Sequence, residues 1–368
     1  MANTSTHDVV KPQKIAATAA AALESQLVLP ALFQREGIDQ YKGTVNDTIN
    51  VKVEGVLPFH TYAWRSGQKN TPNYNGGNRQ EVTFDEYAER TVSVSFGGNV
   101  YSGVRLTDEQ NEFDLPGWAK LVSKQTDAIG RGLEFEAADY LINAPYAVTL
   151  GGAVDLDGAG SSTATRSLRD TLIKARAVLN AFKVPQTGRA MIVGTGWEAA
   201  LLSDEKLNLA GNVGEQEAVS ALRDASIGRR FGFDIVVSQE LPADMAVAMV
   251  KSAFIFATGA PAVPQSVPFG ATASARGVAV RWLRDYDSTS FQDRSIVNTY
   301  RGFRSVSDLL LGRDGSTTNA MISEHEHFVR AIKLDLDATS DSLPTGAAEG
   351  DAADELARIT GIGTPFEG

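Results

Sequence analysis

The sequence predicts an α+β protein, and two observations carry that prediction. Several short segments alternate apolar and polar residues, which is the period of a strand with one buried face. Several longer segments repeat apolar residues every three or four positions, which is the period of an amphipathic helix. At 368 residues the chain is long enough for roughly two domains and a sizeable core.

The first predicted element is a helix within residues 14–33, placed as an N-terminal arm. Its apolar side chains recur at helical spacing until Pro30 interrupts the pattern. They are Ile15, Ala19, Ala22, Leu23 and Leu27. Because nothing before the helix offers a local packing surface, we expect this arm to need a partner surface.

Two strands and a long loop come next. Residues 44–53 and 90–100 alternate apolar and polar side chains, whereas the residues between them show neither period. Such a connection far exceeds a hairpin loop of about 2–5 residues and is usually functional or disordered. Tyr62, Trp64 and Tyr74 at its tip argue against disorder and predict a surface that another molecule covers.

The charge of this loop favours a protein partner over nucleic acid. Residues 57–80 carry Arg65, Lys69 and Arg79 and no acid, but the returning limb, residues 81–90, carries four acids and one base. The acidic limb would repel phosphate, whereas a projection with both signs suits docking on a like neighbour. The net charge of the whole chain, −11, also disfavours a dedicated nucleic-acid-binding protein.

The clearest helix spans residues 116–143. Asp114 can cap it, Pro116 suits its first turn, and Pro145 marks its end. One apolar stripe runs along it, made of Trp118, Val122, Ile129, Leu133, Ala137, Tyr140 and Leu141. At 1.5 Å per residue the helix would be about 42 Å long, so we expect it to lie across a sheet or along a subunit.

Beyond a Gly/Ser-rich linker at residues 151–165, shorter elements alternate. Helices are predicted at residues 167–183, 197–202 and 215–225. Strands are predicted at residues 189–193, 233–237, 253–256, 277–283, 293–303 and 328–334, with a turn at 285–288.

Signatures of catalysis are scarce, and no catalytic, cofactor-binding or metal-binding residue is predicted. Four histidines and no cysteine leave few groups for acid–base or nucleophilic chemistry. His325 and His327 could form a metal pair, but the sequence shows no third ligand nearby, so a solvated polar segment is expected.

Two glycine-containing motifs are also interpreted as structural. A calcium-like loop begins at Asp155 but has Arg166 where a glutamate is required, so it is interpreted as a flexible linker. Gly194 and Gly196 resemble part of a dinucleotide-binding turn, yet Ala199 occupies the third glycine position, which disfavours nucleotide binding.

Composition excludes further classes of protein. The absence of cysteine excludes disulfide scaffolds and thiolate zinc sites, and it fits assembly in a reducing cytoplasm. We find no secretory signal and no uninterrupted stretch of about 20 apolar residues, so a soluble protein without a membrane partner is expected.

Five segments together carry a family resemblance. They are Leu29-Pro30-Ala31-Leu32-Phe33 and residues 100–109, 190–204, 231–242 and 280–287. In their order and spacing, the chain resembles the major capsid (coat) protein of tailed double-stranded DNA bacteriophages, which has the Hong Kong 97-type fold. Within that family it looks closest to the podovirus-type coat protein group, and the resemblance covers most of residues 14–334.

The resemblance implies a division of the chain. It places an N-terminal arm at residues 1–43, an extended loop at 44–100, a peripheral domain with a spine helix at 101–164, an axial domain at 165–275 and the return strands of the peripheral domain at 276–334. The extended-loop residues expected to contact another subunit are Tyr62, Trp64, Arg65, Lys69, Tyr74 and Arg79. The acids expected to receive them on that neighbour are Asp108, Glu109 and Glu112.

The resemblance further implies a structural protein without enzymatic activity or cofactor. Copies would form the hexamers and pentamers of an icosahedral virion shell, assembled in the host bacterial cytoplasm around double-stranded DNA that is not read by sequence. A scaffolding protein and a portal are expected partners, and binding of a decoration protein is left open. Two alternatives remain: the shell of an encapsulin-like compartment, and a nucleotide-dependent enzyme using residues 194–197.

The C-terminal residues 335–368 lie outside the shared pattern. They hold eight acids and one base, a net charge of −7, which leaves −4 for the rest of the chain. Since large apolar side chains are few here, we expect residues 338–368 to bury too little surface to offset the entropy of ordering. The role of this acidic tail is open.

Overall fold

A computed structural model of the protein describes residues 12–37, 48–53, 57, 59, 84, 90–110, 118–151, 167–204, 228–267, 269–313, 320–336, 340–344 and 352–362. The chain divides into two compact units. Unit 1 comprises Met1–Asn50, Ser93–Pro145 and Thr187–Val306. Unit 2 comprises Val51–Val92, Tyr146–Gln186 and Ser307–Gly368.

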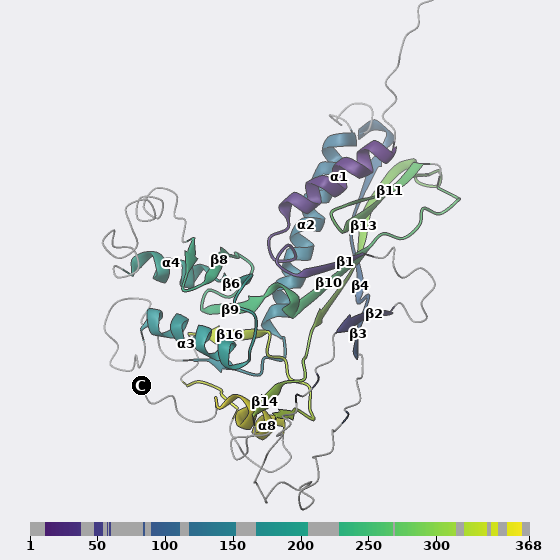
Figure 1. The fold of residues 1–368 in the computed structure, drawn as a ribbon. Helices are drawn as coiled ribbons and strands as arrows, with labels where there is room; N and C mark the ends of the chain where they lie inside the picture. The colour runs from purple at the N-terminus through teal and green to yellow at the C-terminus, as the bar shows by residue number, and fades with distance from the viewer. Residues whose placement is uncertain are drawn as a thin grey trace, which may run out of the picture. The chain divides into compact units, whose positions relative to one another are not determined.

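The main sheet of unit 1 has six strands, which Figure 1 shows beside two helices. The strands are, in order, β1 (Gln34–Gly37), β10 (Phe254–Gly259), β13 (Gln292–Ser305), β12 (Val278–Asp287) and β11 (Phe269–Ala275), and β4 (Gly98–Thr107) also pairs with β13. The 14-residue β13 pairs antiparallel with β4, β10 and β12, so it is the strand that holds the sheet together.

The long helix α2 (Trp118–Ile142) lies against β4 and β13. Its 25 residues make it about 37 Å long, and most of the predicted stripe is buried: Val122, Ile129, Leu133, Ala137 and Leu141. At its C-terminal end, Tyr140 stacks on Phe303, and Phe33 and Phe254 complete an aromatic cluster there. The predicted cap, Asp114, lies outside the described residues.

The predicted N-terminal helix is present as α1 (Pro12–Gln26), with Ala16, Ala19, Ala20 and Leu23 buried. The surface that we expected it to need lies in its own unit, because α1 packs against α2, β11 and β12. Gly130 of α2 permits this approach: a Cβ there would lie 2.9 Å from Gln26 Oε1 and 3.4 Å from Leu23 Cδ1.

Unit 1 also contains a second group of paired strands. They are β7 (Arg229–Arg230), β8 (Phe233–Val237), β6 (Arg189–Val193) and β9 (Met245–Val250), paired in that order. Helix α4 (Thr195–Ser203) follows β6, and a short 3-10 turn, η4 (Lys251–Ala253), joins β9 to β10. Every residue of β9 is buried, which explains why its sequence does not alternate.

Two strands stand at the base of the long loop. β2 (Thr48–Val53) and β3 (Arg90–Ser95) pair with each other, and Ser93 Oγ donates to Asn50 Oδ1 at 2.8 Å. The first predicted strand is confirmed, whereas the second, predicted at residues 90–100, is divided between β3 and β4, which belong to different sheets. The loop between them falls almost entirely outside the described residues.

Unit 2 contains helix α3 (Leu168–Ala181), strands β5 (Thr149–Leu150) and β16 (Ala331–Asp335), the hairpin β14 (Leu311–Arg313) and β15 (Ala320–Ile322), and helix α8 (Ala352–Thr360). The predicted start of α3 is confirmed, because Ser167 caps it: its Oγ accepts from Asp170 N at 3.2 Å and donates to Asp170 Oδ2 at 2.7 Å. Strands β5 and β16 pair in parallel.

Three sequence predictions are wrong or incomplete. Strands β1, β5, β7, β9, β11, β14 and β15 were not predicted, nor was the part of β4 beyond residue 100. In β9, only Val247 and Val250 are the β-branched residues that mark strands. The turn between β12 and β13 lies at residues 288–291 instead of 285–288. The C-terminal residues are not without structure, since α8 forms and buries Leu356 and Ile359. The helix predicted at residues 215–225 and the linker at 152–165 lie outside the described residues.

Candidate subunit-contact surface

The outer face of the unit 1 sheet carries an open groove of about 500 Å³. Cross-strand pairing aligns Gly103, Ile296 and Leu283 in one row and Arg105, Arg294 and Asp285 in the next. Tyr101 is 71% exposed at the rim and Ile296 is 39% exposed, which is unusual for large apolar side chains on an ordered sheet. The groove therefore offers an apolar floor beside a charged row.

The charged row is held in place by ion pairs. Arg294 Nη2 lies 2.7 Å from Asp285 Oδ2, and Arg294 Nη1 lies 3.7 Å from Asp287 Oδ2. Hydrogen bonds from Thr289 and Ser290, together with Arg294, lower the pKa of Asp287, although slight desolvation opposes them. Arg105 projects from β4 and is exposed.

The opposite face of the same strands is fixed to α2 by buried polar contacts. Gln125, 2% exposed, donates through Nε2 to the carbonyl oxygens of Ser102 and Ser295, each at 3.0 Å. Its Oε1 accepts from Ser295 Oγ at 2.8 Å, and that hydroxyl accepts from Trp282 Nε1 at 3.0 Å. Since these groups are fully paired, the grooved sheet is backed by a rigid helix.

Two of the predicted docking acids lie at the end of β4. Asp108 and Glu109 are both exposed, and Asp108 Oδ2 accepts a 3.0 Å hydrogen bond from the hydroxyl of Tyr286. That hydrogen bond is the main reason why the pKa of Tyr286 is raised. The third acid, Glu112, lies outside the described residues.

The predicted loop contacts cannot be compared with this surface. Tyr62, Trp64, Arg65, Lys69, Tyr74 and Arg79 all lie outside the described residues. The structure describes three residues of the loop, and all three are exposed: Leu57 at 49%, Phe59 at 55% and Phe84 at 89%. The docking of the loop on Asp108 and Glu109 therefore remains a prediction.

The glycines that resemble a nucleotide-binding turn have a packing role. A Cβ on Gly194 would lie 2.0 Å from the carbonyl oxygen of Pro242, and one on Gly196 would lie 2.6 Å from that of Ala243. Trp197 is fully buried and donates through Nε1 to Asp244 O at 2.7 Å. The strand–helix turn is thus filled by the chain's own backbone, which supports the prediction that residues 194–197 do not bind a nucleotide.

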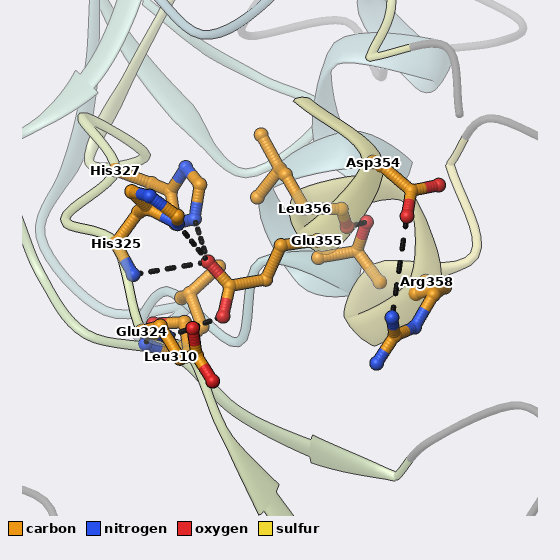
Figure 2. A network of polar contacts seen from close by, with 10 residues as sticks. Leu310, Glu324, His325, His327, Asp354, Glu355, Leu356 and Arg358 are labelled. Atoms are coloured by element: carbon orange, nitrogen blue, oxygen red, sulfur yellow. Dashed lines mark hydrogen bonds and ion pairs between the residues drawn. The ribbon is translucent and has the colours of Figure 1, made fainter. Parts of the chain in front are cut away.

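The prediction of a solvated polar segment holds only in part, because His325 is exposed whereas His327 is buried. Figure 2 shows the Glu355 carboxylate reaching them from α8, with Oε2 at 3.1 Å from His325 Nδ1 and 3.3 Å from His327 Nε2. His327 is 6% exposed and Glu355 7%. Glu355 was not predicted as a partner because it lies about 30 residues away in the sequence. The helix that carries it did have local signals: Leu356 and Ile359 at helical spacing, acids in the first turn and Arg358 in the last turn.

Within the part of the chain that the structure describes, no group of three or more His, Asp or Glu side chains is suited to hold a metal ion. No helix there is long and apolar enough to cross a membrane. The polar contacts between Gln125, Ser295 and Trp282 were also missed from the sequence, because nothing local to a glutamine or serine indicates a partner 170 residues away.

Comparison with solved structures identifies the fold. The chain is similar to a structure from Mycobacterium phage Che8 at 18% identity and a TM-score of 0.55, over 84% of this chain and 90% of that one. It is similar to the mature capsid of bacteriophage PhiM1 at 10% identity and a TM-score of 0.54, over 84% of this chain and 87% of that one. It is also similar to the capsid of cyanophage P-SCSP1u at 10% identity and a TM-score of 0.55, over 83% of this chain and 86% of that one. The latter two are phage capsids, and the structures share the Hong Kong 97-type fold, so the predicted α+β class and fold are confirmed.

Comparison with protein families gives the same result. A search of the curated proteins found no match. A family model described as phage capsid protein matches residues 101–306, which extend from β4 through α2 to the end of β13 and include the whole grooved sheet face. The match covers more than half of the chain, and the chain therefore belongs to the phage capsid protein family.

Proposed function

We propose that copies of this chain assemble into the hexamers and pentamers of an icosahedral shell that encloses packaged double-stranded DNA, as the major capsid protein of a tailed phage. The observation that supports a self-contact is the groove around Tyr101 and Ile296. An exposed apolar floor beside fixed charges is the composition of a protein interface, with an apolar centre and a polar rim.

The partner on this face would be the extended loop of a neighbouring copy. The loop tip brings the aromatic residues Tyr62, Trp64 and Tyr74 and three cations without an acid. Aromatic rings suit the apolar floor, and cations suit the exposed carboxylates of Asp108 and Glu109. Each chain would both give a loop and receive one, which is a heterologous contact that closes into rings.

We assign the domains on the same basis. Residues 101–164, which include α2, and the return strands at 276–334 would form the peripheral domain, residues 165–275 the axial domain and residues 44–100 the extended loop. The role is structural and not catalytic, and the shell belongs to the virion. DNA would be enclosed without sequence-specific contacts; a scaffolding protein and a portal would take part in assembly, and a decoration protein could bind the finished shell.

Charge reversal in the loop tests the docking role. Arg65→Glu with Lys69→Glu should abolish intact shells, because both charges would then face carboxylates. Lys124→Glu, an exposed lysine on α2, is the matched control and should leave the yield unchanged. Shells are counted by negative-stain electron microscopy after sedimentation, and a normal yield from the double variant would contradict the docking role.

The content of purified particles tests the enclosing role separately. Particles from infected cells should contain double-stranded DNA that resists nuclease until the shell is disrupted. Particles filled with an enzyme in place of DNA would favour the compartment-shell alternative.

A further inference from the structure

The C-terminal residues are attached to unit 2 at two separate places. We name the described parts of this segment, residues 340–344 and 352–362, the C-terminal strap. At the first place, Ser342 and Thr149 exchange backbone hydrogen bonds of 2.8 and 3.1 Å, and Asp341 accepts from Gly151 N at 3.1 Å and pairs with Lys174. The acidic tail therefore already uses one of its carboxylates within the chain.

The second place is the packing of α8 on the hairpin. Leu356 is 2% exposed, Ile359 8% and Ile362 0%. Gly312 of β14 makes room for the helix, since a Cβ there would lie 2.3 Å from Ile359 Cγ2 and 2.9 Å from Ile359 O. Only glycine permits an approach this close without a shift of the backbone.

A single carboxylate joins α8 to the segment after β15. Glu355 Oε1 accepts from Glu324 N, and Oε2 accepts from His325 N at 3.0 Å as well as facing both imidazoles. Four donors therefore converge on one side chain. Figure 2 shows that Asp354 and Arg358, which pair at 4.0 Å, lie on the other side of the helix.

We propose that α8 is a releasable latch of the C-terminal strap, locked by ionised Glu355, and that acid opens it while the attachment at Asp341 and Ser342 holds. Neutral Glu355 can accept fewer hydrogen bonds and carries no charge to attract the imidazoles, so its protonation removes the lock. Release uncovers Leu356, Ile359 and Ile362 together with the hairpin surface beneath them.

The electrostatic surroundings agree with this latch. Burial raises the pKa of Glu355, but hydrogen bonds from Glu324 N, His325 N and the two imidazoles outweigh it, so the pKa lies below its ordinary value. The charged and titratable side chains described around the carboxylate are Glu324, His325, Glu326, His327, Asp308, Arg330, Asp354 and Arg358. Asp308 is neutralised by Arg330, whose Nε lies 2.5 Å from Asp308 Oδ2.

Hydrogen exchange followed by mass spectrometry on the full-length chain tests the latch. At pH 7, Glu355→Gln should reduce protection of residues 352–362 by about tenfold or more, the factor that corresponds to losing one hydrogen bond to a charged group. Residues 340–344 and helix α3 should keep their protection. Asp354→Asn, the adjacent acid on the same helix, is the matched control and should reduce protection by no more than about twofold, because it loses only its pair with Arg358.

The unmodified chain gives a second measurement that does not depend on a variant folding. After correction for intrinsic exchange, protection of residues 352–362 should fall as pH is lowered below about 4.5, the ordinary pKa of the carboxyl group, before α3 loses protection. Unchanged exchange in Glu355→Gln would overturn the proposal. So would a loss that extends equally through α3 and residues 340–344, because the carboxylate would then stabilise the whole unit.

Discussion

One glutamate anchors a segment near each end of the chain, Glu134 for residues 28–29 and Glu355 for α8, but burial and hydrogen bonding shift the pKa values of the two carboxyl groups in opposite directions. Near the N-terminus, Glu134 of α2 accepts from the backbone N–H groups of Val28 and Leu29 and so fixes the chain where α1 ends. Near the C-terminus, Glu355 accepts from two backbone N–H groups and faces two imidazoles. Burial raises the pKa of Glu134 more than its two hydrogen bonds lower it, whereas at Glu355 four donors outweigh burial.

This difference shows that the same residue can anchor a segment in two ways. At Glu134, Oε1 lies within reach of both N–H groups, and Oε2 accepts only from Leu29 N, at 3.1 Å. A neutral amide whose oxygen takes the place of Oε1 would therefore still offer both groups an acceptor. At Glu355, both oxygens are needed as acceptors and the charge itself is used. The N-terminal anchor depends on position, and the C-terminal anchor depends on ionisation.

The largest expected effects come from the apolar contacts beneath the two anchors. Leu23→Ala removes a fully buried side chain and should cost about 2–5 kcal/mol, as Ile359→Ala should on α8. In hydrogen-exchange measurements, Leu23→Ala should lose protection in residues 12–29, and Ile359→Ala should lose it in residues 352–362. If Ile359→Ala left α8 as protected as before, packing would not hold the C-terminal helix and the comparison would fail.

Amide substitution should then separate the two anchors. Glu134→Gln should change the free energy of unfolding by less than about 1 kcal/mol at pH 7, because its oxygen still accepts and a buried charge is removed. Glu355→Gln should lower the local stability of α8 by about 1–3 kcal/mol, because its nitrogen would face a donor. Denaturant-dependent hydrogen exchange measures both, and Glu134→Ala, which removes the acceptor, is the control. Equal losses from the two amide variants would show that both anchors rely on charge.

The pH dependence should have opposite signs at the two ends. Because the folded pKa of Glu134 is raised above 4.5, its stabilising contribution is present below that value and is lost as pH rises through the folded pKa. Because the folded pKa of Glu355 is lowered below 4.5, its contribution is present above that value and is lost as pH falls. Lowering pH from 7 to below 4.5 should therefore increase the protection of residues 27–29 and begin to reduce the protection of α8. Each amide variant should abolish the response at its own end.

The smallest expected effect is at the i,i+4 ion pair on α8. Asp354 and Arg358 lie 4.0 Å apart at helical spacing, and such pairs contribute about 0.3–0.5 kcal/mol. Arg358→Ala should therefore change the stability of α8 by that amount at low salt and by less at high salt. If Arg358→Ala lowered the stability of α8 as much as Glu355→Gln does, the ion pair on the helix surface, and not the Glu355 carboxylate, would be the main polar contact that holds α8.

Much of unit 1 could be predicted from the sequence, because its elements have strong local signals. The stripe of α2 follows helical spacing, and alternation in β12 and β13 marks strands with one buried face. The candidate contact surface was predicted only in part. Asp108 and Glu109 were identified, but the groove beside them was not, because Tyr101, Leu283 and Ile296 come from three strands that only the sheet register brings together.

The sequence by itself determined the fold family, the long spine helix, the start of α3 at Ser167 and the absence of cysteine chemistry. Only the tertiary structure decided that the acidic tail is ordered in part. Its few apolar residues cannot offset the entropy of ordering as an isolated segment. They do so on the hairpin because Gly312 admits Ile359, and because Glu355 finds donors about 30 residues away that no local pattern could indicate.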